Sequence, residues 1–368
     1  MKKAEIITIF DNTNFGTYLQ ALALALVIKK SGFEVEIVDY IRPGQSEKAR
    51  KRFANNFIKK VYYTFLEIPR WKKFRQDCHA FVNRFVRLSK KQYTSYKELK
   101  DNPPLADIYV TGSDQVWNSI YNNGIDKSFY LDFAPPGHKR IAYAASIGMR
   151  EIPEGEVEET KRLLHKYSAI TVRETGASRI LAGLGVNDVP VVLDPTLLLD
   201  KTAWTDIARQ FSPIKTEPYI LVYSVEEKAQ NELIGRYAGM MSRKHGWKIY
   251  EISYNSYHRR LKFADRHFLQ VTPEIFLQLM LNAEFVIVSS FHGTAFSINF
   301  NKQFLTVTPN RFNSRVDNIL TLCNLKDRLV TSPSFDISAL QPIDYNEVNK
   351  IIDVERNKSI SLLNNMLA

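Results

Sequence analysis

Cysteine and long apolar runs are scarce in this sequence, and each scarcity excludes a class of protein. With only Cys78 and Cys323 among 368 residues, neither a disulfide framework nor a cysteine-rich zinc site can form. The longest apolar run, Leu19–Ile28, is interrupted by Gln20 and is shorter than the ~20 residues that a membrane span requires. An earlier apolar run stops at Asp11, so no signal peptide is expected. We therefore expect a cytoplasmic protein.

Metal-binding and nucleotide-binding motifs are missing as well. The sequence has no HExxH motif and no carboxylate-rich spacing of the kind that binds metal, which disfavours a metal hydrolase. Gly16 stands alone after its strand and does not make the glycine fingerprint of dinucleotide-binding domains. We expect no metal and no resident cofactor. The composition, 45% hydrophobic and 24% charged, excludes a wholly disordered chain.

Positive charge is plentiful but confined to one segment. The formal net charge is +11, yet residues 48–100 contain sixteen Lys or Arg against three acidic residues, and the rest of the chain has a net charge of −2. Apolar residues recur in this basic segment at helical spacing, in one series before Pro69 and in a second series after it. The two series are Phe53, Phe57, Val61, Phe65 and Ile68, and then Phe74, Cys78, Phe81, Phe85 and Leu88.

Two interpretations of this basic segment are compatible with each other. Two amphipathic helices can pack their apolar stripes on the core and leave their basic residues in water. The basic faces of residues 48–100 can also lie against an anionic membrane surface, where each nearby Lys or Arg contributes ~1 kcal/mol at low screening. The second interpretation makes the protein peripheral on the inner face of the membrane. No nucleic-acid-binding motif accompanies the charge, so nucleic acid is not an expected partner.

Strand-like and helix-like segments alternate along the chain, which is typical of doubly wound parallel sheets. We expect an α/β protein with two Rossmann-like domains that face a cleft, a GT-B-like arrangement. Residues 1–205 form the first domain, with a basic helical insertion at 47–100. Residues 206–345 form the second domain, and a helix at 346–368 packs back across both.

The expected strands are Glu5–Phe10, Glu34–Asp39, Asp107–Thr111, Arg140–Ala145, Ala169–Arg173, Val189–Leu193, Tyr219–Val225, Lys248–Ser253, Phe285–Ser289 and Gln303–Val307. The expected helices are Tyr18–Lys30, Pro153–Lys166, Thr175–Gly183, Glu226–His245, Pro273–Ala283, one beginning at Thr294, and Asn346–Leu367. In such sheets ligands bind beyond the carboxyl ends of the strands, so polar residues there are the first candidates for a site.

Two polar loops follow strands in the N-terminal half. After the first strand, Asn14 and Gly16 precede a helix whose N-terminus can attract an anion, although an ordinary turn also explains them. A second loop, Thr111–Asn118, follows an apolar strand. Asp114 in that loop orients a sugar hydroxyl, acts as a base, or simply forms an Asx-type turn.

A more informative site follows the strand that ends at Ser289. His292 stands between this buried strand and a helix N-terminus suited to phosphate, which favours a functional role over that of a structural histidine. Arg173 closes another strand, and Arg311 and Arg315 follow the last strand of the second domain. Because Arg makes bidentate contacts with phosphate and carboxylate, these cations and His292 together indicate a small, strongly anionic ligand.

Taken together, these motifs resemble the polysaccharide pyruvyl transferase family. The matching pieces occur in the family's order between residues 14 and 293, and the basic segment lies outside them. They are Asn14–Gln20, Gly112–Trp117, Tyr143–Gly148, Val172–Glu174, Asp194–Leu198 and Ser290–Gly293.

The resemblance implies transfer of pyruvate from phosphoenolpyruvate onto two hydroxyls of a sugar as a cyclic ketal. The acceptor is then a saccharide, lipid-linked, of a capsule, an exopolysaccharide or a wall polymer. By position, Arg173 and His292 match the family's basic residues that hold or activate phosphoenolpyruvate. The expected donor-binding residues are Arg173, His292, Gly293, Thr294, Ser290, Arg315 and Arg311; the expected acceptor-binding residues are Asn14, Gly16, Ser113, Asp114, Gln115 and Trp117.

The chemistry of such a transfer assigns roles to these residue types. We expect His292 to protonate the donor or stabilise the departing phosphate, and Asp114 to orient or deprotonate the acceptor hydroxyl. One position departs from the family, since many members have an Arg where this chain has Ser290. Arg315 or Arg311 is the expected replacement for that cation.

Two other functions remain open at this point. A GT-B glycosyltransferase that uses a nucleotide-sugar donor would share the fold and a phosphate site at a helix end. A non-catalytic protein that binds a membrane or a polyanion through residues 48–100 would need neither His292 nor Arg173.

Overall fold

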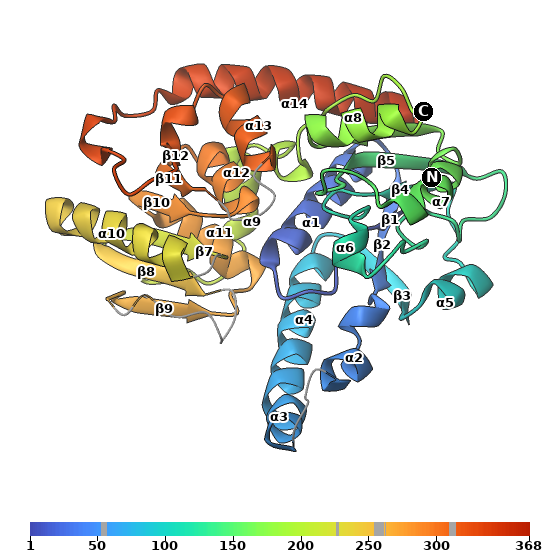
Figure 1. Cartoon of the computed structure of the whole chain (residues 1–368), viewed down its shortest axis with the longest axis horizontal. Coiled ribbons are helices and arrows are strands. Elements are labelled where there is room, and N and C mark those ends of the chain that lie inside the picture. The colour runs from blue at the N-terminus through green and yellow to red at the C-terminus, as the bar shows by residue number, and fades with distance from the viewer. Residues whose placement is uncertain (53–56, 226–227, 254–260, 262, 309–313) are drawn as a thin grey trace. The chain divides into compact units, whose positions relative to one another are not determined.

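The structure is a computed structural model of the chain, and it describes residues 1–52, 57–225, 228–253, 261, 263–308 and 314–368. Two compact units are present. The N-terminal unit comprises residues 1–198 and 357–368, and the C-terminal unit comprises residues 199–356. Each unit contains a parallel sheet of six strands flanked by helices (Figure 1), which confirms the expected α/β class.

The sheet of the N-terminal unit has the strand order β3-β2-β1-β4-β5-β6. This is the Rossmann order, in which the direction of winding reverses between β1 and β4 and creates a crevice for ligands there. The strands are β1 (Lys3–Ile7), β2 (Glu34–Tyr40), β3 (Arg87–Tyr93), β4 (Ile108–Thr111), β5 (Lys139–Ala145) and β6 (Ala169–Val172). The helices outside the basic segment are α1 (Phe15–Lys30), α6 (Ser119–Asn122), α7 (Val157–Leu164) and α8 (Thr175–Gly183).

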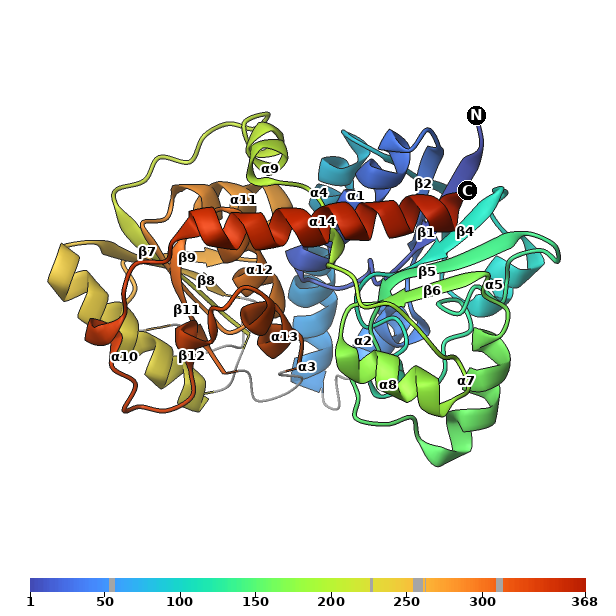
Figure 2. The same ribbon diagram turned by 90° about the horizontal axis from the view of Figure 1, so that it is seen from above.

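The sheet of the C-terminal unit repeats this topology, with the order β12-β11-β10-β7-β8-β9 and a reversal between β7 and β10. In Figure 2 helix α10 lies along β7 and β8. The strands are β7 (Tyr219–Ser224), β8 (Lys248–Ser253), β9 (Arg266–Leu269), β10 (Phe285–Val288), β11 (Gln303–Val307) and β12 (Leu329–Val330). The helices are α9 (Lys201–Ala208), α10 (Lys228–His245), α11 (Pro273–Asn282), α12 (Phe291–Asn299), α13 (Ser314–Leu322) and α14 (Tyr345–Leu367), and the end of α14 from Asn357 groups with the N-terminal unit.

Most expected elements are confirmed to within a few residues, and one expected strand is wrong. Val189–Leu193 contributes only an isolated bridge between Val191 and Val172, because its neighbours turn into the loop that begins at Asp194. Strand β3 was not expected. It is a largely exposed edge strand whose cationic and polar residues protect the edge, and its Leu88 was expected at the end of the second helical series.

The basic segment contains α2 (Glu47–Arg52), a helical arm, β3 and α5 (Tyr96–Asp101). The arm is α3 (Phe57–Tyr62), a π-helical turn (Tyr63–Glu67) and α4 (Ile68–Asn83). The backbone stays right-handed helical at both junctions, so the three pieces form one rod (Figure 1).

The two apolar series of the basic segment behave differently. Phe74, Cys78 and Phe81 of the second series are buried and face α1, as the packing interpretation expects. In the first series Val61 and Phe65 are exposed, while the side chains of Phe53 and Phe57 lie outside the described part of the chain. Of the described helices, none has both the length and the apolar character needed to cross a membrane.

Candidate functional site

The loops after β1 and β4 meet at the reversal point of the N-terminal sheet, and a buried glutamine of α1 ties them together. The Gln20 side-chain amide donates to Thr8 Oγ1 (3.0 Å), and its Oε1 accepts a hydrogen bond from the Ser113 backbone N–H (3.0 Å). Thr8 Oγ1 in turn donates to the Ser113 carbonyl oxygen (2.8 Å). Gln20 was not among the expected site residues, although it is the polar residue that interrupts the apolar run of α1.

Glycine is required at position 112 in the second of these loops. Gly112 has φ +108°, and a Cβ atom there would lie 2.2 Å from the carbonyl oxygen of Tyr143. Because the backbone at Gly112 lies this close to β5, Ser113 reaches the carboxyl end of that strand. Its hydroxyl is within hydrogen-bond distance of the Ala144 carbonyl (2.7 Å) and of Asp194 Oδ2 (3.3 Å). Ser113 therefore fixes the loop to its surroundings, and it is fully buried.

Arg173 lies at the end of β6 in a buried cluster of carboxylates. Its guanidinium donates to Asp194 Oδ2 (2.5 Å) and to Asp114 Oδ1 (3.3 Å), and its Nε lies 4.0 Å from a Glu174 carboxylate oxygen. All four side chains are at least 90% buried. Burial alone would lower the pKa of Arg173, but the charges of Asp194, Asp114 and Glu174 raise it above its ordinary value.

Each carboxylate of this cluster also organises its own loop. Glu174 Oε1 accepts hydrogen bonds from Ser146 Oγ (2.8 Å) and from the backbone N–H of Ile147 (3.2 Å). Asp194 Oδ1 accepts from the backbone N–H of Thr196 (3.0 Å). Motifs that are far apart in sequence thus supply one buried ionic network. Glu174 and Asp194 were not expected as site residues, although both lie in pieces of the sequence that resemble the family and each follows a strand or a bridge.

A second buried ion pair lies at the ends of β1 and β2. The Arg42 guanidinium donates to both Asp11 carboxylate oxygens, the shortest contact being 2.7 Å, and to Asn122 Oδ1 at 2.9 Å. Burial would lower the pKa of Arg42, and Asp11 overcomes this and raises it. The pair connects three strand-end loops and was not expected, because nothing in the local sequence around Asp11 indicates a partner at Arg42.

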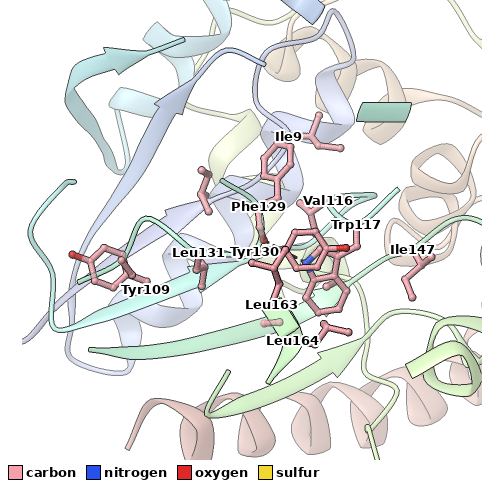
Figure 3. Packing of buried hydrophobic residues seen from close by; sticks show 14 of the residues in the cluster. Ile9, Tyr109, Val116, Trp117, Phe129, Tyr130, Leu131, Ile147, Leu163 and Leu164 are labelled. Carbon is pink, nitrogen blue, oxygen red and sulfur yellow. Dashed lines mark hydrogen bonds between the residues drawn. The ribbon is translucent and has the colours of Figure 1, made fainter. Parts of the chain in front are cut away.

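The expected acceptor residues fall into two groups. Asn14 caps α1 by accepting from the Gly16 N–H (2.9 Å), and Asp114 and Gln115 lie at the β4 end, with Gln115 Oε1 accepting from the Asn118 amide (2.7 Å). Trp117, in contrast, is 2% exposed and belongs to the hydrophobic core. Its indole stacks on Tyr130 with centroids 5.7 Å apart, as Figure 3 shows.

A cavity of about 730 Å³ lies beside the loop that follows β2 and the residues that follow α6. Its lining includes the Tyr40 and Tyr96 rings, the Asn122 amide and the Asp126 carboxylate, to which the Tyr40 hydroxyl donates at 2.8 Å. Burial raises the pKa of Asp126. Aromatic faces beside amide and carboxylate groups suit a polyhydroxylated ligand.

In the C-terminal unit the reversal point carries neutral hydroxyl groups and a helix N-terminus. Ser290 is the N-cap of α12, and its Oγ accepts from the Gly293 N–H (3.0 Å). Thr294 Oγ1 donates to the Ser290 carbonyl and shares a hydrogen bond with Thr306 (3.0 Å each). The preceding residue, Ser289, accepts from the Val225 N–H at 3.1 Å. These groups follow β7, β10 and β11 at one edge of the sheet.

His292 is 6% exposed in the first turn of α12, and its ring packs edge-on against Phe291 (5.4 Å between centroids). The Arg315 guanidinium, from α13, lies over the same Phe291 ring at 5.9 Å from its centroid. The structure thus places Arg315 beside the residue that precedes His292, whereas Arg311 lies outside the described residues.

The expected donor residues belong to different units. Arg173 is part of the N-terminal unit, and His292, Gly293, Thr294, Ser290 and Arg315 are part of the C-terminal unit. A site shared by Arg173 and His292 stays a prediction.

Comparison with known proteins identifies a family and a fold. The sequence model of the family described as "Polysaccharide pyruvyl transferase" matches residues 14–311. No curated protein matches the chain in sequence.

Solved structures resemble the chain over almost its whole length. UGT89C1 of Arabidopsis thaliana, complexed with UDP-L-rhamnose, aligns with a TM-score of 0.53 at 9% identity and covers 100% of both chains. MnaA of S. aureus, in a structure with UDP, aligns with 0.52 at 12% identity and covers 96% of this chain and 87% of its own. The UDP-GlcNAc 2-epimerase of Methanocaldococcus jannaschii aligns with 0.50 at 13% identity, covering 97% and 93%. At these identities the likeness shows the fold alone, which is the expected two-domain Rossmann-like fold of the GT-B kind.

Proposed function

This chain belongs to the polysaccharide pyruvyl transferase family, and we propose that it transfers pyruvate from phosphoenolpyruvate onto two hydroxyls of a saccharide, forming a cyclic ketal. The family match over residues 14–311 makes the chain a transferase, and it is the observation on which the choice of reaction rests. The choice of donor and the ketal product are our inference from the chemistry of the strand-end residues.

The C-terminal unit supplies groups suited to an anionic donor. The first turn of α12 offers backbone N–H groups and a partial positive charge, and the guanidinium of Arg315 adds a full charge nearby. We assign phosphate and carboxylate binding to this turn and to Arg315, in place of the Arg that many family members have at Ser290. His292, in the same turn, is the proposed general acid.

The N-terminal unit supplies groups suited to the acceptor. We assign to Asp114 the orientation or deprotonation of the attacking hydroxyl, and to the cavity beside Tyr40 and Asp126 the binding of saccharide rings. Arg173 contacts Asp114 and Asp194 and is almost wholly buried, so its proposed role is to hold the Asp114 carboxylate in place.

The reaction balances with these groups. A proton from His292 adds to the methylene carbon of phosphoenolpyruvate and creates cationic character at the central carbon, which the first hydroxyl attacks while losing its proton to Asp114. The C–O bond to phosphate then breaks, and the second hydroxyl bonds to the same carbon and gives its proton to His292, which the first step left neutral. The proton on Asp114 leaves with the released phosphate, so both groups return to their starting states. The products are the pyruvate ketal and inorganic phosphate, with no oxidant or reductant required.

Isotope transfer tests the proposal. The chain is incubated with a saccharide acceptor and either phosphoenolpyruvate labelled in the pyruvyl carbons or a labelled nucleotide sugar. We expect label from phosphoenolpyruvate in an acid-labile ketal, together with stoichiometric phosphate. Transfer of labelled sugar from the nucleotide would instead establish a glycosyltransferase.

Replacement of His292 tests the assignment of the acid. We expect His292→Gln to lower kcat by roughly 100- to 10,000-fold, the usual contribution of a positioned acid or base, with little change in the melting temperature. The matched control is His245→Gln, since His245 is exposed in the same unit and stacks on Trp247. Wild-type turnover in His292→Gln would rule out the acid role.

We propose further that the acceptor is lipid-linked and that the enzyme works at the inner face of a membrane. The net charge of +13 in residues 48–100 supports this location, because anionic headgroups attract Lys and Arg within a Debye length of the surface.

A further inference from the structure

The tip of the helical arm exposes apolar side chains in an unusually dense group. Val61 is 42% exposed, Phe65 is 70% exposed and Leu66 is 45% exposed. Elsewhere in the described chain, large exposed apolar residues stand singly, as Leu105 and Val354 do, or as the one pair Ile120 and Tyr121. A single exposed apolar residue needs no explanation, but three within six positions form a patch of the kind that marks an interaction surface.

The π-helical turn explains why these side chains leave the buried stripe. At α-helical spacing Val61, Phe65 and Ile68 would share one face, and Ile68 is buried. A π-helical turn takes about one residue more than an α-helical turn, so it rotates the residues before it away from the face that follows. The Tyr62 hydroxyl donates to Glu67 Oε1 at 2.5 Å across this turn and holds it in place.

Cations surround the exposed tip. Lys59 and Lys60 are exposed on α3, and Arg70 follows the π-helical turn with its side chain 51% exposed. Glu67 is the acidic residue of the stretch from 57 to 73, and its carboxylate lies 3.8 Å from Arg70. The tip therefore combines an apolar centre with a positive rim.

Positive charge continues from the tip along the arm. A cavity of about 830 Å³ between α2 and α4 is lined by Lys48 and Arg52 from α2 and by Lys72 from α4. Lys72 and Lys51 bind Glu47, and these two ammonium groups lower the pKa of Glu47 to about 2. Even with that acid ionised, the lining has an excess of positive charge.

We propose that the tip formed by Val61, Phe65 and Leu66 inserts into an anionic lipid surface, while Lys59, Lys60 and Arg70 contact the headgroups. Apolar residues that enter the headgroup boundary and cations that stay in it are the two parts of an interfacial anchor, and this tip has both. An acidic protein surface would match the cations but would leave the aromatic ring of Phe65 without a partner. The inference deepens the proposed work at a membrane and rests on that proposal for the identity of the partner.

Flotation of the whole protein with vesicles tests the anchor. Vesicles of phosphatidylcholine alone are compared with vesicles that also contain phosphatidylglycerol, without any substrate. We expect binding to the anionic vesicles only, weakening when salt is raised from 0.1 to 0.5 M. Failure of the wild-type chain to bind anionic vesicles would overturn the anchor.

Two variants separate the apolar and the ionic parts. Phe65→Ser with Leu66→Ser should lower the vesicle partition coefficient by at least about tenfold, and Lys59→Gln with Lys60→Gln should do so at low salt. The matched control is Leu105→Ser, which changes an equally exposed apolar residue away from the arm. Melting temperatures should be unchanged in all of them. Unchanged binding of the tip variants, or a wild-type dimer in solution that the Phe65→Ser change dissociates, would overturn the proposal.

An activity assay with a water-soluble acceptor and no vesicles measures the transfer reaction independently of membrane binding. The tip variants should retain wild-type turnover there. A chain that binds vesicles but forms no ketal would overturn the proposed function and leave the anchor standing, and the reverse result would overturn the anchor alone.

Discussion

The two units have the same sheet topology but place opposite kinds of chemistry at the point where the strand order reverses. In the N-terminal unit the strand ends hold buried ions: Arg173 with Asp114 and Asp194, and Arg42 with Asp11. In the C-terminal unit the corresponding residues are uncharged hydroxyls such as Ser224, Ser289 and Ser290 beside the N-terminus of α12.

This difference shows how one topology can serve two substrates. A guanidinium that already contacts several carboxylates in a buried site has its charge compensated, and it fixes its neighbours in place. A helix N-terminus capped by a hydroxyl keeps an uncompensated partial positive charge, which favours an anion. The N-terminal edge is therefore a rigid frame for Asp114, and the C-terminal edge is suited to the anionic donor.

Among the changes that test this difference between the units, removal of the Arg173 charge should have the largest effect, and that effect is on stability. Arg173→Met leaves Asp114 and Asp194 buried without a cation, and breaking a buried pair in this way costs about 3–5 kcal/mol. We expect that loss in the free energy of unfolding of the N-terminal unit, measured by chemical denaturation. Arg162→Met is the control, because Arg162 pairs with Glu159 at the surface and its removal should change the free energy of unfolding far less than that of Arg173. If the two variants had equal free energies of unfolding, Arg173 would not be what stabilises the buried carboxylates of the N-terminal unit.

The buried ions of the N-terminal unit also predict a pH dependence. Burial, and then the charge of Arg75, lower the pKa of His79 to about 4, against about 6.5 in an unfolded chain. Below pH 6.5 the unfolded state binds more protons than the folded state, so the fold is progressively destabilised as the pH falls from 6.5 to 4, and above pH 6.5 this effect is absent. The full effect corresponds to about 3 kcal/mol. His79→Phe should lack this part of the acid destabilisation, whereas His165→Phe, at an exposed site, should keep it.

In the C-terminal unit, removal of the Arg315 charge should have a smaller effect, and that effect is on donor binding. Arg315→Ala removes a cation from the neighbourhood of α12, and we expect KM for phosphoenolpyruvate to rise about tenfold with a smaller change in kcat. Steady-state kinetics measure this, with Arg243→Ala on α10 as the control. A loss of kcat at unchanged KM would show that Arg315 does not hold the donor in the ground state.

The smallest expected effect comes from the cap of α12. Ser290→Ala removes the hydrogen bond that Ser290 Oγ accepts from the Gly293 N–H, and it should cost about 1 kcal/mol of unfolding free energy. The same variant tests whether the cap shapes an anion site. Added phosphate should raise the melting temperature of the wild-type chain, and it should raise that of Ser290→Ala by less. An equal rise in both would show that the cap does not shape an anion site.

Much of the fold could be predicted because its signals are local. Strands such as β8 and β11 were predicted to the residue, since a short apolar run between turns needs no information from elsewhere in the chain. The strand-end loops with Asp114 and His292 were predicted for the same reason. The edge strand β3 was not, because its residues are largely exposed and polar.

The partners of the charged residues could not be predicted in this way. Arg173 has a visible position at the end of a strand, but its contact with Asp194 depends on loops that the fold brings together. The exposure of Phe65 likewise depends on a π-helical turn that the spacing of apolar residues does not reveal. In both cases sequence reasoning identified the residue and not its surroundings.

The sequence by itself determined two doubly wound units, their family and the strand ends at which function should lie, because periodicity, capping and motif order act over short stretches of chain. Only the tertiary structure decided that Arg173 is enclosed by carboxylates while the first turn of α12 is capped by a serine hydroxyl and lies near the Arg315 guanidinium. Pairing of buried charges is set by distances through space, and those distances exist only once the strands lie side by side.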